Sequence, residues 1–463
     1  MTGLDLRRII VLWCVVDRSS MIGDLVTNRI VLVATAGALL ASLAMTAIAN
    51  GRTARHRHGV RRARLATDNP DQVVQWNQEL QKVLAAPGAQ PASIHPTRTL
   101  AITHIAVYDA VNGIRRGGEP LVVNLDGPRS ASAEAAVTSA ARTALDALLP
   151  SQQSTIDAFF HASRAKIGSD EHVKRGVLFG ERVATAVLAA RANDGAAGTP
   201  PVFTPGSGPG EYRLTPPTFA PAAFTQTPHV TPFALETASQ FRPAPPPTLT
   251  SPKYAADFNE VHSLGELNSV TRSGDQTAIG KFWGAAPIWI VWNQIADQAA
   301  FGFGNTLDQS ARLFALLDTS LADGAIALYD AKYAFHRWRP IIAITAPDQG
   351  NPNTTADPNW VPLANTANDP SYPGAHATFS VAAATVLEDF FGTDVFSFSL
   401  TNPSVGLIRT FTSFSTASDE ASASRIFAGQ HFRYDEEAGQ TLGSQVADFV
   451  VDHALLHTDN QRR

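Results

Sequence analysis

The sequence has very little cysteine: Cys14 is the only one among 463 residues. It lies in an N-terminal stretch that we expect to be absent from the mature protein. Disulfide bonds, cysteine-ligated zinc and a cysteine nucleophile are therefore excluded from the folded part. The chain is long enough to bury a substantial core, as one large helical domain or two medium ones, and its stability must come from that core.

The sequence also lacks a strong excess of charge of either sign. Its formal net charge is −5, with 17% charged and 44% hydrophobic residues, which is ordinary for a globular protein. This balance gives no reason to expect a nucleic acid as a partner. Almost no stretch alternates polar and apolar residues with a period of two, so the sequence predicts an all-α protein.

Residues 1–49 are interpreted as an upstream extension followed by a targeting segment. Met21 fits as the start, because it places Arg29 directly before the apolar run 30–49. The run ends in Ala47-Ile48-Ala49, which matches a small-residue cleavage site and predicts a secreted or cell-envelope protein. The run is also long enough to span a bilayer, and arginines follow it, so an uncleaved membrane anchor stays open as an alternative.

The rest of the chain divides by composition into four segments. Residues 50–68 read as a solvated basic spacer, and residues 69–194 as an N-terminal helical bundle. Residues 195–250 hold nearly half of the 30 prolines and show no helical period. We predict that they form an ordered loop over the helices, as the wall of an entrance. Residues 251–458 are predicted to form a C-terminal helical bundle that carries the site.

Apolar residues at helical spacing locate the expected helices within the two bundles. The predicted ranges are 73–86, 98–111, 131–149, 172–192, 254–264, 276–300, 307–335, 377–391, 421–431 and 434–456, with a loop over 340–372 and a turn after 391. His104 and Asp109 fit polar groups buried in a bundle. Trp283, Trp289 and Trp292 fit a core rather than a cofactor platform.

Three clusters hold the residues with the most evident chemistry, at 332–340, 372–376 and 424–435. Among their residues are three cations, Lys332, Arg339 and Arg425, two histidines, His376 and His431, and one carboxylate, Asp435. Arginine forks and a lysine charge suit a tetrahedral oxyanion such as phosphate or vanadate. One histidine could bond to the central atom, and the other could move a proton. The clusters therefore predict an oxyanion site.

The spacing of these clusters resembles the type 2 phosphatidic acid phosphatase superfamily, which includes bacterial acid phosphatases and vanadium-dependent haloperoxidases. The matching pattern is Lys332-x6-Arg339-Pro340, then Pro-x-x-His ending at His376, then Ser424-Arg425-x5-His431-x3-Asp435. The middle cluster departs from the family, which usually has Pro-Ser-Gly-His where this chain has Pro373-Gly374-Ala375-His376. The resemblance implies two helical bundles of the vanadium chloroperoxidase type, and a homodimer formed through the first bundle.

The resemblance also implies a role for each matching residue. The vanadate cofactor, or phosphate in the same cradle, would be held by Lys332, Arg339, Gly374, Ala375, Arg425 and His431. His431 would be the nucleophile or the vanadium ligand, Asp435 its hydrogen-bond partner, and His376 the acid or base. Gly374 has no hydroxyl and cannot make the hydrogen bond that the family serine donates to an oxyanion oxygen. Because a lost hydrogen bond to a charged group costs on the order of 1.5–3 kcal/mol, we expect weakened oxyanion affinity.

Two further positions bear on the reaction that this site performs. Asp369 stands where resemblance to chloride-oxidising haloperoxidases would suggest an aromatic residue, and Tyr329 stands where it would suggest tryptophan. A carboxylate near the halide path would repel chloride and bromide. Asp369 therefore weakens the haloperoxidase interpretation without removing it.

Three functions are compatible with these residues. The first is a vanadate-dependent haloperoxidase, with hydrogen peroxide and a halide or small organic substrate as partners. The early segment 103–113 resembles bacterial vanadium-haloperoxidase-like proteins, and no set of membrane spans flanks the motifs. The second is a phosphomonoester hydrolase of the acid phosphatase type, working through a phosphohistidine at His431. The third is an oxyanion-binding homologue without turnover.

Overall fold

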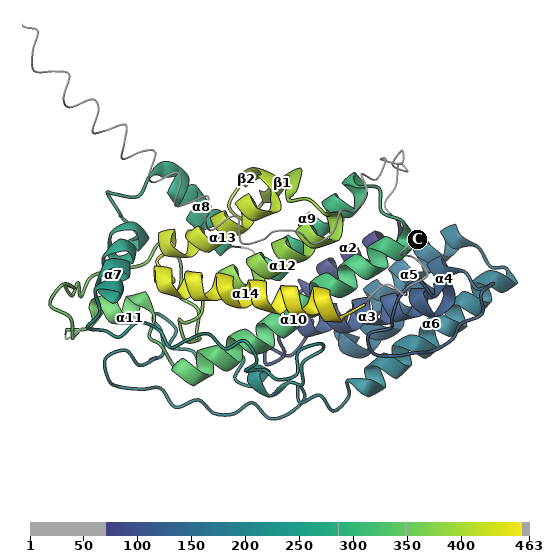
Figure 1. The fold of residues 1–463 in the computed structure, drawn as a ribbon, viewed down its shortest axis with the longest axis horizontal. Coiled ribbons are helices and arrows are strands. Elements are labelled where there is room, and N and C mark those ends of the chain that lie inside the picture. The colour runs from purple at the N-terminus through teal and green to yellow at the C-terminus, as the bar shows by residue number, and fades with distance from the viewer. Residues whose placement is uncertain (1–70, 286, 348–349, 456–463) are drawn as a thin grey trace, which may run out of the picture. The chain divides into compact units, whose positions relative to one another are not determined.

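The computed structural model describes residues 71–285, 287–347 and 350–455, and the predicted segments 1–49 and 50–68 lie outside them. The described residues form thirteen α-helices, two short 3-10 helices and one two-stranded hairpin (Figure 1). The prediction of a mostly helical protein is confirmed. In these same residues, no helix is both long and apolar enough to cross a membrane.

Five α-helices form the N-terminal part of the fold. They are α2 (Gln72–Leu84), α3 (Pro96–Arg115), α4 (Ala133–Leu148), α5 (Gln153–Ile167) and α6 (Glu171–Ala190), with the 3-10 helix η1 (Pro150–Gln152) before α5. Asp71, Ser132 and Asp170 cap α2, α4 and α6 by accepting first-turn backbone hydrogen bonds. The helix α5 is absent from the sequence prediction, since only Ile156 and Ser163 of it are buried and its apolar period is weak.

The C-terminal part holds the remaining helices and the hairpin. They are α7 (Pro252–Gly265), α8 (Gly274–Gly284), α9 (Ile288–Gly302), α10 (Leu307–Phe335), α11 (Pro340–Thr345), α12 (Ala375–Phe391), β1 (Val395–Asn402), β2 (Leu407–Ser413), α13 (Phe414–Phe427) and α14 (Arg433–His453). The 3-10 helix η2 (Thr227–His229) lies in the proline-rich segment.

Three sequence predictions about these elements are wrong in detail. The helix expected over 276–300 is two helices, because Pro287 has an extended backbone and starts α9. The short helix α11 lies in the expected loop 340–372. The expected turn after 391 contains an antiparallel hairpin, in which Phe398 pairs with Phe411. The alternation of Phe396, Phe398 and Leu400 was the signal for it, too short to stand out.

The helix α10 is the central element of the fold, and its predicted range is confirmed. Thr306 and Gln309 form a capping box at its start, and His336 ends it with a left-handed backbone of φ 49°. In Figure 1 it crosses the middle of the molecule beside α3, α12 and α14. Its side chains are buried on nearly every face, so it belongs to one hydrophobic core that runs from α2 to α14. Boundaries near 194 and 251 stay a prediction.

The proline-rich segment 195–250 is ordered and is held to the helices by specific hydrogen bonds. The buried carboxylate of Asp323, on α10, accepts the backbone N–H groups of Phe233, Ala234 and Leu235 at 2.7–2.9 Å. Further along, the Tyr372 hydroxyl donates to the carbonyl of Ala244 at 2.6 Å. The segment therefore lies against the part of the chain that carries the candidate site.

The two early polar residues are buried structural groups, as the sequence predicts. His104 of α3 pairs with Asp318 of α10, and both side chains are almost fully buried. Asp109 accepts backbone hydrogen bonds from three successive residues, Leu121 to Val123. The first contact joins α3 to α10, and the second holds residues 121–123 against α3.

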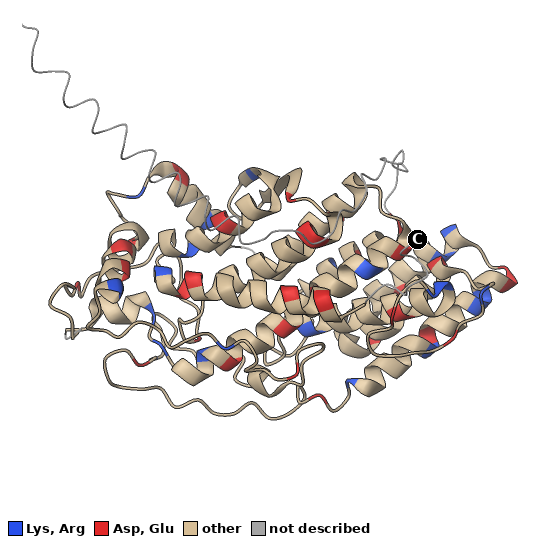
Figure 2. Cartoon of the chain, in the orientation of Figure 1, with Lys and Arg blue, Asp and Glu red and all other residues tan. Residues whose placement is uncertain are grey.

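Charged side chains are intermixed over the surface. Figure 2 shows the blue and red positions interspersed along most helices, without one face of a single sign in this view. The charge that matters for chemistry is buried, at the ends of helices α10, α13 and α14.

Glycines let α14 lie close against α12. A methyl group added at Gly443 would lie 2.3 Å from the backbone oxygen of Thr378 on α12. We therefore expect Gly443→Ala to push the two helices apart and to lower the free energy of unfolding by about 1–3 kcal/mol. Gly274→Ala is the matched control, since nothing lies within 4 Å of the added methyl group there. Urea unfolding of both variants checks this, and equal midpoints would contradict it.

Candidate oxyanion site

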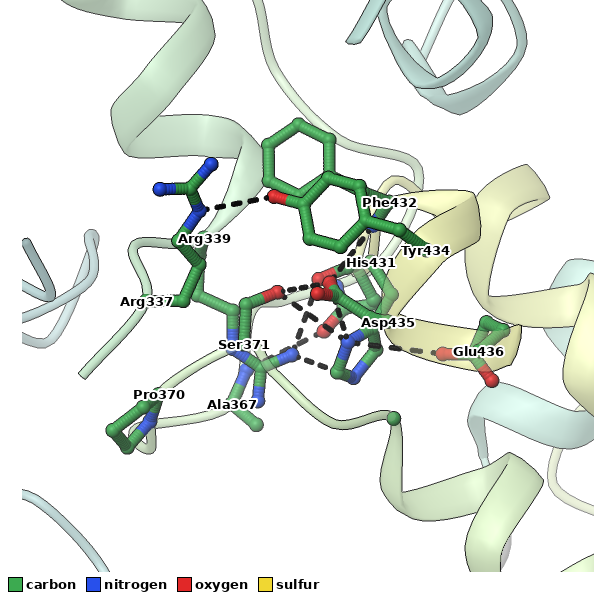
Figure 3. A network of polar contacts seen from close by, with 12 residues as sticks. Arg337, Arg339, Ala367, Pro370, Ser371, His431, Phe432, Tyr434, Asp435 and Glu436 are labelled. Atoms are coloured by element: carbon green, nitrogen blue, oxygen red, sulfur yellow. Dashed lines mark hydrogen bonds and ion pairs between the residues drawn. The ribbon is translucent and has the colours of Figure 1, made fainter. Parts of the chain in front are cut away.

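The three sequence clusters meet in one buried place. Lys332 lies in the last turn of α10, and Arg339 caps the start of α11. The first turn of α12 brings His376, and α13 brings Arg425 in its last turn. His431 follows in the loop before α14. Figure 3 shows Arg339, Ser371, Asp435 and Glu436 around the His431 ring.

The protonation of His431 follows from its two neighbours. Nη1 of Arg339 donates to Nε2 of His431 at 2.8 Å. Because a guanidinium group only donates, Nε2 holds the lone pair and Nδ1 holds the hydrogen. That hydrogen faces Oδ2 of Asp435, 3.2 Å away. Burial, and then the charges of Arg339 and Lys332, keep the pKa of His431 well below its usual range. The ring is therefore neutral and presents a nucleophilic nitrogen.

The His431–Asp435 pair is made by a break between two helices and not by one continuous helix. The helix α13 ends at Phe427, α14 begins at Arg433, and Asp435 sits in the first turn of α14. Oδ2 of Asp435 also accepts the backbone N–H of Phe432 at 3.0 Å. The carboxylate is thus a helix cap and a histidine partner together.

Ser371 is a member of the site that the sequence analysis missed. Its hydroxyl donates to Oδ2 of Asp435 at 2.6 Å and lies 3.4 Å from Nδ1 of His431. Burial raises the pKa of Asp435 to about 6, although this hydrogen bond acts in the opposite direction. The only signal in the sequence was its place directly before Tyr372-Pro373.

Two of the three predicted cations are paired with Asp369. Nε of Arg339 donates to the backbone oxygen of Asp369 at 2.8 Å, and its Nη2 donates to the carboxylate. Nζ of Lys332 lies 3.5 Å from the same carboxylate and donates to the carbonyl of Ser371 at 3.1 Å. Burial alone would raise the pKa of Asp369, but the two cations outweigh it and lower that pKa. Asp369 is thus an internal counter-ion in the cradle.

Arg425 is the cation with unused hydrogen-bonding groups. Its side chain is buried, and neither Nε nor Nη1 has a hydrogen-bond partner within the part of the chain that the structure describes. Burial lowers its pKa to about 10, so it stays protonated at neutral pH. A buried guanidinium with unpaired N–H groups is costly, and an anion bound beside it would pair them.

His376 stands at the start of α12, as the second residue of that helix. Its Nε2 lies 3.1 Å from the carbonyl oxygen of Trp283. A carbonyl only accepts, so Nε2 holds the hydrogen and Nδ1 the lone pair. Burial, and then the charge of Arg425, hold the pKa of His376 well below its usual range. Gly374 caps this helix and Ala375 begins it, so its first-turn N–H groups form one wall of the site.

The remaining predicted residues lie around the site or in the core. Tyr329 is buried on α10, where its ring packs beside Phe224 and His95. Trp283 and Trp292 are buried in the core as predicted, and Trp289 packs at the edge of it. None of these tryptophans presents a flat platform to the cradle.

Glu436 is a second acidic residue that the sequence analysis did not single out. Its side chain is buried, and both carboxyl oxygens lack a hydrogen-bond partner among the described residues. Oε1 lies 3.7 Å from Nδ1 of His431 (Figure 3). Burial and the neighbouring Asp435 raise the pKa of Glu436 to about 8.

This set of groups fits a tetrahedral oxyanion. It offers unpaired guanidinium N–H groups, a helix N-terminus and a neutral imidazole nitrogen, which are the partners that phosphate and vanadate use. In the described residues, no group of three or more His, Cys, Asp or Glu side chains is placed to bind a metal cation. The residues therefore match vanadate as an anion rather than a bare metal ion.

Comparisons with known proteins agree with this assignment. A family model described as the VCPO second helical-bundle domain matches residues 312–460, which contain all three clusters. The vanadium chloroperoxidase of Curvularia inaequalis is 28% identical over 240 residues, which cover 38% of this chain and 39% of that protein. The chain thus matches well under half of that relative's length.

Solved structures show the same fold over most of the chain. The first bacterial vanadium-dependent iodoperoxidase superposes with a TM-score of 0.75 at 23% identity, covering 86% of this chain and all of that one. The holo form of a bacterial vanadium-dependent chloroperoxidase gives a TM-score of 0.62 at 15% identity, covering 84% and 98% of the two chains. Residues 312–460, which hold the motifs, are thus similar in sequence to the second helical-bundle domain of vanadium chloroperoxidase, and most of the chain shares the fold of these bacterial vanadium-dependent haloperoxidases.

Proposed function

We propose that this protein is a vanadate-dependent haloperoxidase, which oxidises a halide with hydrogen peroxide. The observation that carries the proposal is the buried neutral His431, whose Nε2 accepts a hydrogen bond from Arg339 and whose ring lies in the positive field of Lys332 and Arg425. The similarity in fold to an iodoperoxidase and a chloroperoxidase supports it. Secretion through an N-terminal signal and a homodimeric state are also proposed, as the sequence analysis predicts.

Each residue of the site has a task in this proposal. Arg425 holds the vanadate through its unpaired N–H groups, and Lys332 and Arg339 neutralise its charge. Vanadate, when bound, supplies the electrophilic centre that activates peroxide towards a halide. Nε2 of His431 would be the protein ligand once Arg339, which now donates to it, donates to the oxyanion instead, and Asp435 keeps the hydrogen on Nδ1.

His376 and the helix N-terminus complete the site. Nδ1 of His376 holds a lone pair, so it can accept a proton from the peroxide and return it later in the cycle. Ala375 offers its backbone N–H at the start of α12, where negative charge is stabilised, whereas the N–H of Gly374 already donates to the carbonyl of Asp435. The low pKa of His376 keeps it in the accepting form throughout the neutral range.

The first prediction concerns His431. We expect His431→Ala to weaken vanadate binding by roughly a hundredfold or more, because the bond to the central atom and a buried polar partner are lost together. Titration calorimetry with orthovanadate measures this, beside oxidation of iodide and bromide by peroxide in vanadate-loaded and phosphate-loaded protein. His161→Ala is the matched control, since His161 is exposed on α5.

The same assays separate the proposal from its two alternatives. Halide oxidation that needs vanadate and disappears in His431→Ala supports the haloperoxidase. Hydrolysis of a phosphomonoester, inhibited by vanadate and without halide oxidation, moves the protein to the phosphatases, since phosphate uses the same cradle. Tight binding without either reaction leaves the oxyanion-binding homologue.

The second prediction concerns Asp369, which competes with a bound anion for Lys332 and Arg339. We expect Asp369→Asn to tighten vanadate binding by roughly tenfold or more, because two buried cations lose their internal counter-ion. The ligand-free variant should also unfold at a lower temperature, as buried cations without a partner are costly. Calorimetry and thermal unfolding with and without vanadate test both effects. An affinity equal to that of the wild type would show that Asp369 does not compete.

A further inference from the structure

Gly374 is a glycine for reasons of space and not of backbone conformation. Its φ is −75° and its ψ is 123°, an extended conformation that any residue adopts. A methyl group added there would lie 2.3 Å from Oε1 and 2.6 Å from Cδ of Glu436. The place that a side chain at position 374 would take is therefore filled by the carboxyl group of Glu436.

Helix packing puts Glu436 in that place. It lies in the first turn of α14, one turn before Gly439, whose missing side chain lets α14 approach α12. A methyl group at Gly439 would lie 2.4 Å from the carbonyl oxygen of Gly374. The backbone N–H of Gly374 in turn donates to the carbonyl of Asp435 at 2.8 Å. These contacts hold the Glu436 side chain against the start of α12.

The carboxyl group of Glu436 has no hydrogen-bond partner in the described part of the chain that would explain its burial. The side chain is 3% exposed, and neither oxygen has a hydrogen-bond partner among the described residues. Oε1 lies 3.7 Å from Nδ1 of His431, beyond hydrogen-bonding distance. Arg425 likewise keeps two N–H groups unpaired. Unpaired buried groups of both signs in one place indicate a ligand that pairs with both.

We infer that Glu436 takes over the task of the side chain that Gly374 lacks, and makes a hydrogen bond to one oxygen of the bound oxyanion. This inference rests on the proposed function, because it assumes an oxyanion at His431. Gly374 and Glu436 act together. Because Gly374 has no side chain, space remains beside it, and the carboxyl group of Glu436 occupies that space and supplies the hydrogen-bonding group.

The hydrogen of this bond can come from either partner. A protonated carboxyl group donates to an oxyanion oxygen, whereas a carboxylate accepts from a hydroxyl of hydrogen vanadate or hydrogen phosphate. In both cases one hydrogen lies between the two oxygens, and no further charge is needed. A glutamine at the same position can also donate and accept, so it should support the same contact.

The test is a set of variants of the full-length protein titrated with orthovanadate by calorimetry. We expect Glu436→Ala to weaken vanadate binding roughly tenfold or more, and Glu436→Gln to bind nearly as the wild type does. Gly374→Ser alone should lower the unfolding temperature without tightening binding, since the new side chain meets the Glu436 carboxyl group. Gly374→Ser combined with Glu436→Ala should recover most of the lost affinity, because a serine hydroxyl then has room. Glu437→Ala is the matched control, as its side chain is exposed and pairs with Lys253.

Each result decides the inference. Wild-type affinity in Glu436→Ala, or equal losses in Glu436→Ala and Glu436→Gln, would overturn it while vanadate binding by the wild type still supports the proposed function. No recovery in the double variant would show that positions 374 and 436 do not serve one place. If wild-type protein fails to bind vanadate and phosphate, the proposed function fails and this inference fails with it. Thermal unfolding of every variant shows whether a loss of binding is a loss of fold.

Discussion

The burial of three cations in one place is the constraint on which the site depends. Lys332, Arg339 and Arg425 all lie out of contact with bulk water, where like charges repel strongly and counter-ions must be provided by the protein or by a ligand. Asp369 is the counter-ion of Lys332 and Arg339. Among the residues that the structure describes, Nε and Nη1 of Arg425 have no hydrogen-bond partner, and they are where we propose that the oxyanion binds. Burial first, and then the same positive field, lower the pKa of both histidines and keep each ring neutral.

The rest of the fold serves to hold these charges still. The central helix α10 is anchored to α3 by the buried pair His104–Asp318, and to the proline-rich segment by Asp323. Its last turn carries Lys332 into the site. The close packing of α12 on α14 sets the distance between the helix N-terminus at Gly374 and the acidic pair Asp435 and Glu436. A site of this kind needs rigid elements, because small shifts change the strength of every charged contact in a dry interior.

Compared with the superfamily pattern, this chain rebuilds the anion cradle with carboxyl groups. The family serine is absent, and Glu436 occupies the space that its side chain would fill. The position expected to be aromatic in chloride-oxidising relatives holds Asp369, which turns towards the cations instead of standing as an uncompensated charge. Repulsion of halide by Asp369 is therefore weaker than its formal charge implies, since two cations surround it. By the proposal above, Asp369 instead lowers the affinity for the oxyanion, because it competes with the anion for Lys332 and Arg339.

The sequence by itself determined the helical class, the range of α10 and the three clusters, because these depend on local periodicity and on the short spacing within each motif. It also indicated His431 with Asp435 as a pair, although a helix break and not a helix face brings them together. Tertiary structure alone decided that Asp369 pairs with Lys332 and Arg339, that Ser371 supports Asp435, and that Glu436 fills the space at Gly374. Each of these contacts joins segments far apart in the chain, and it exists only because packing brings those segments together and removes water from between them.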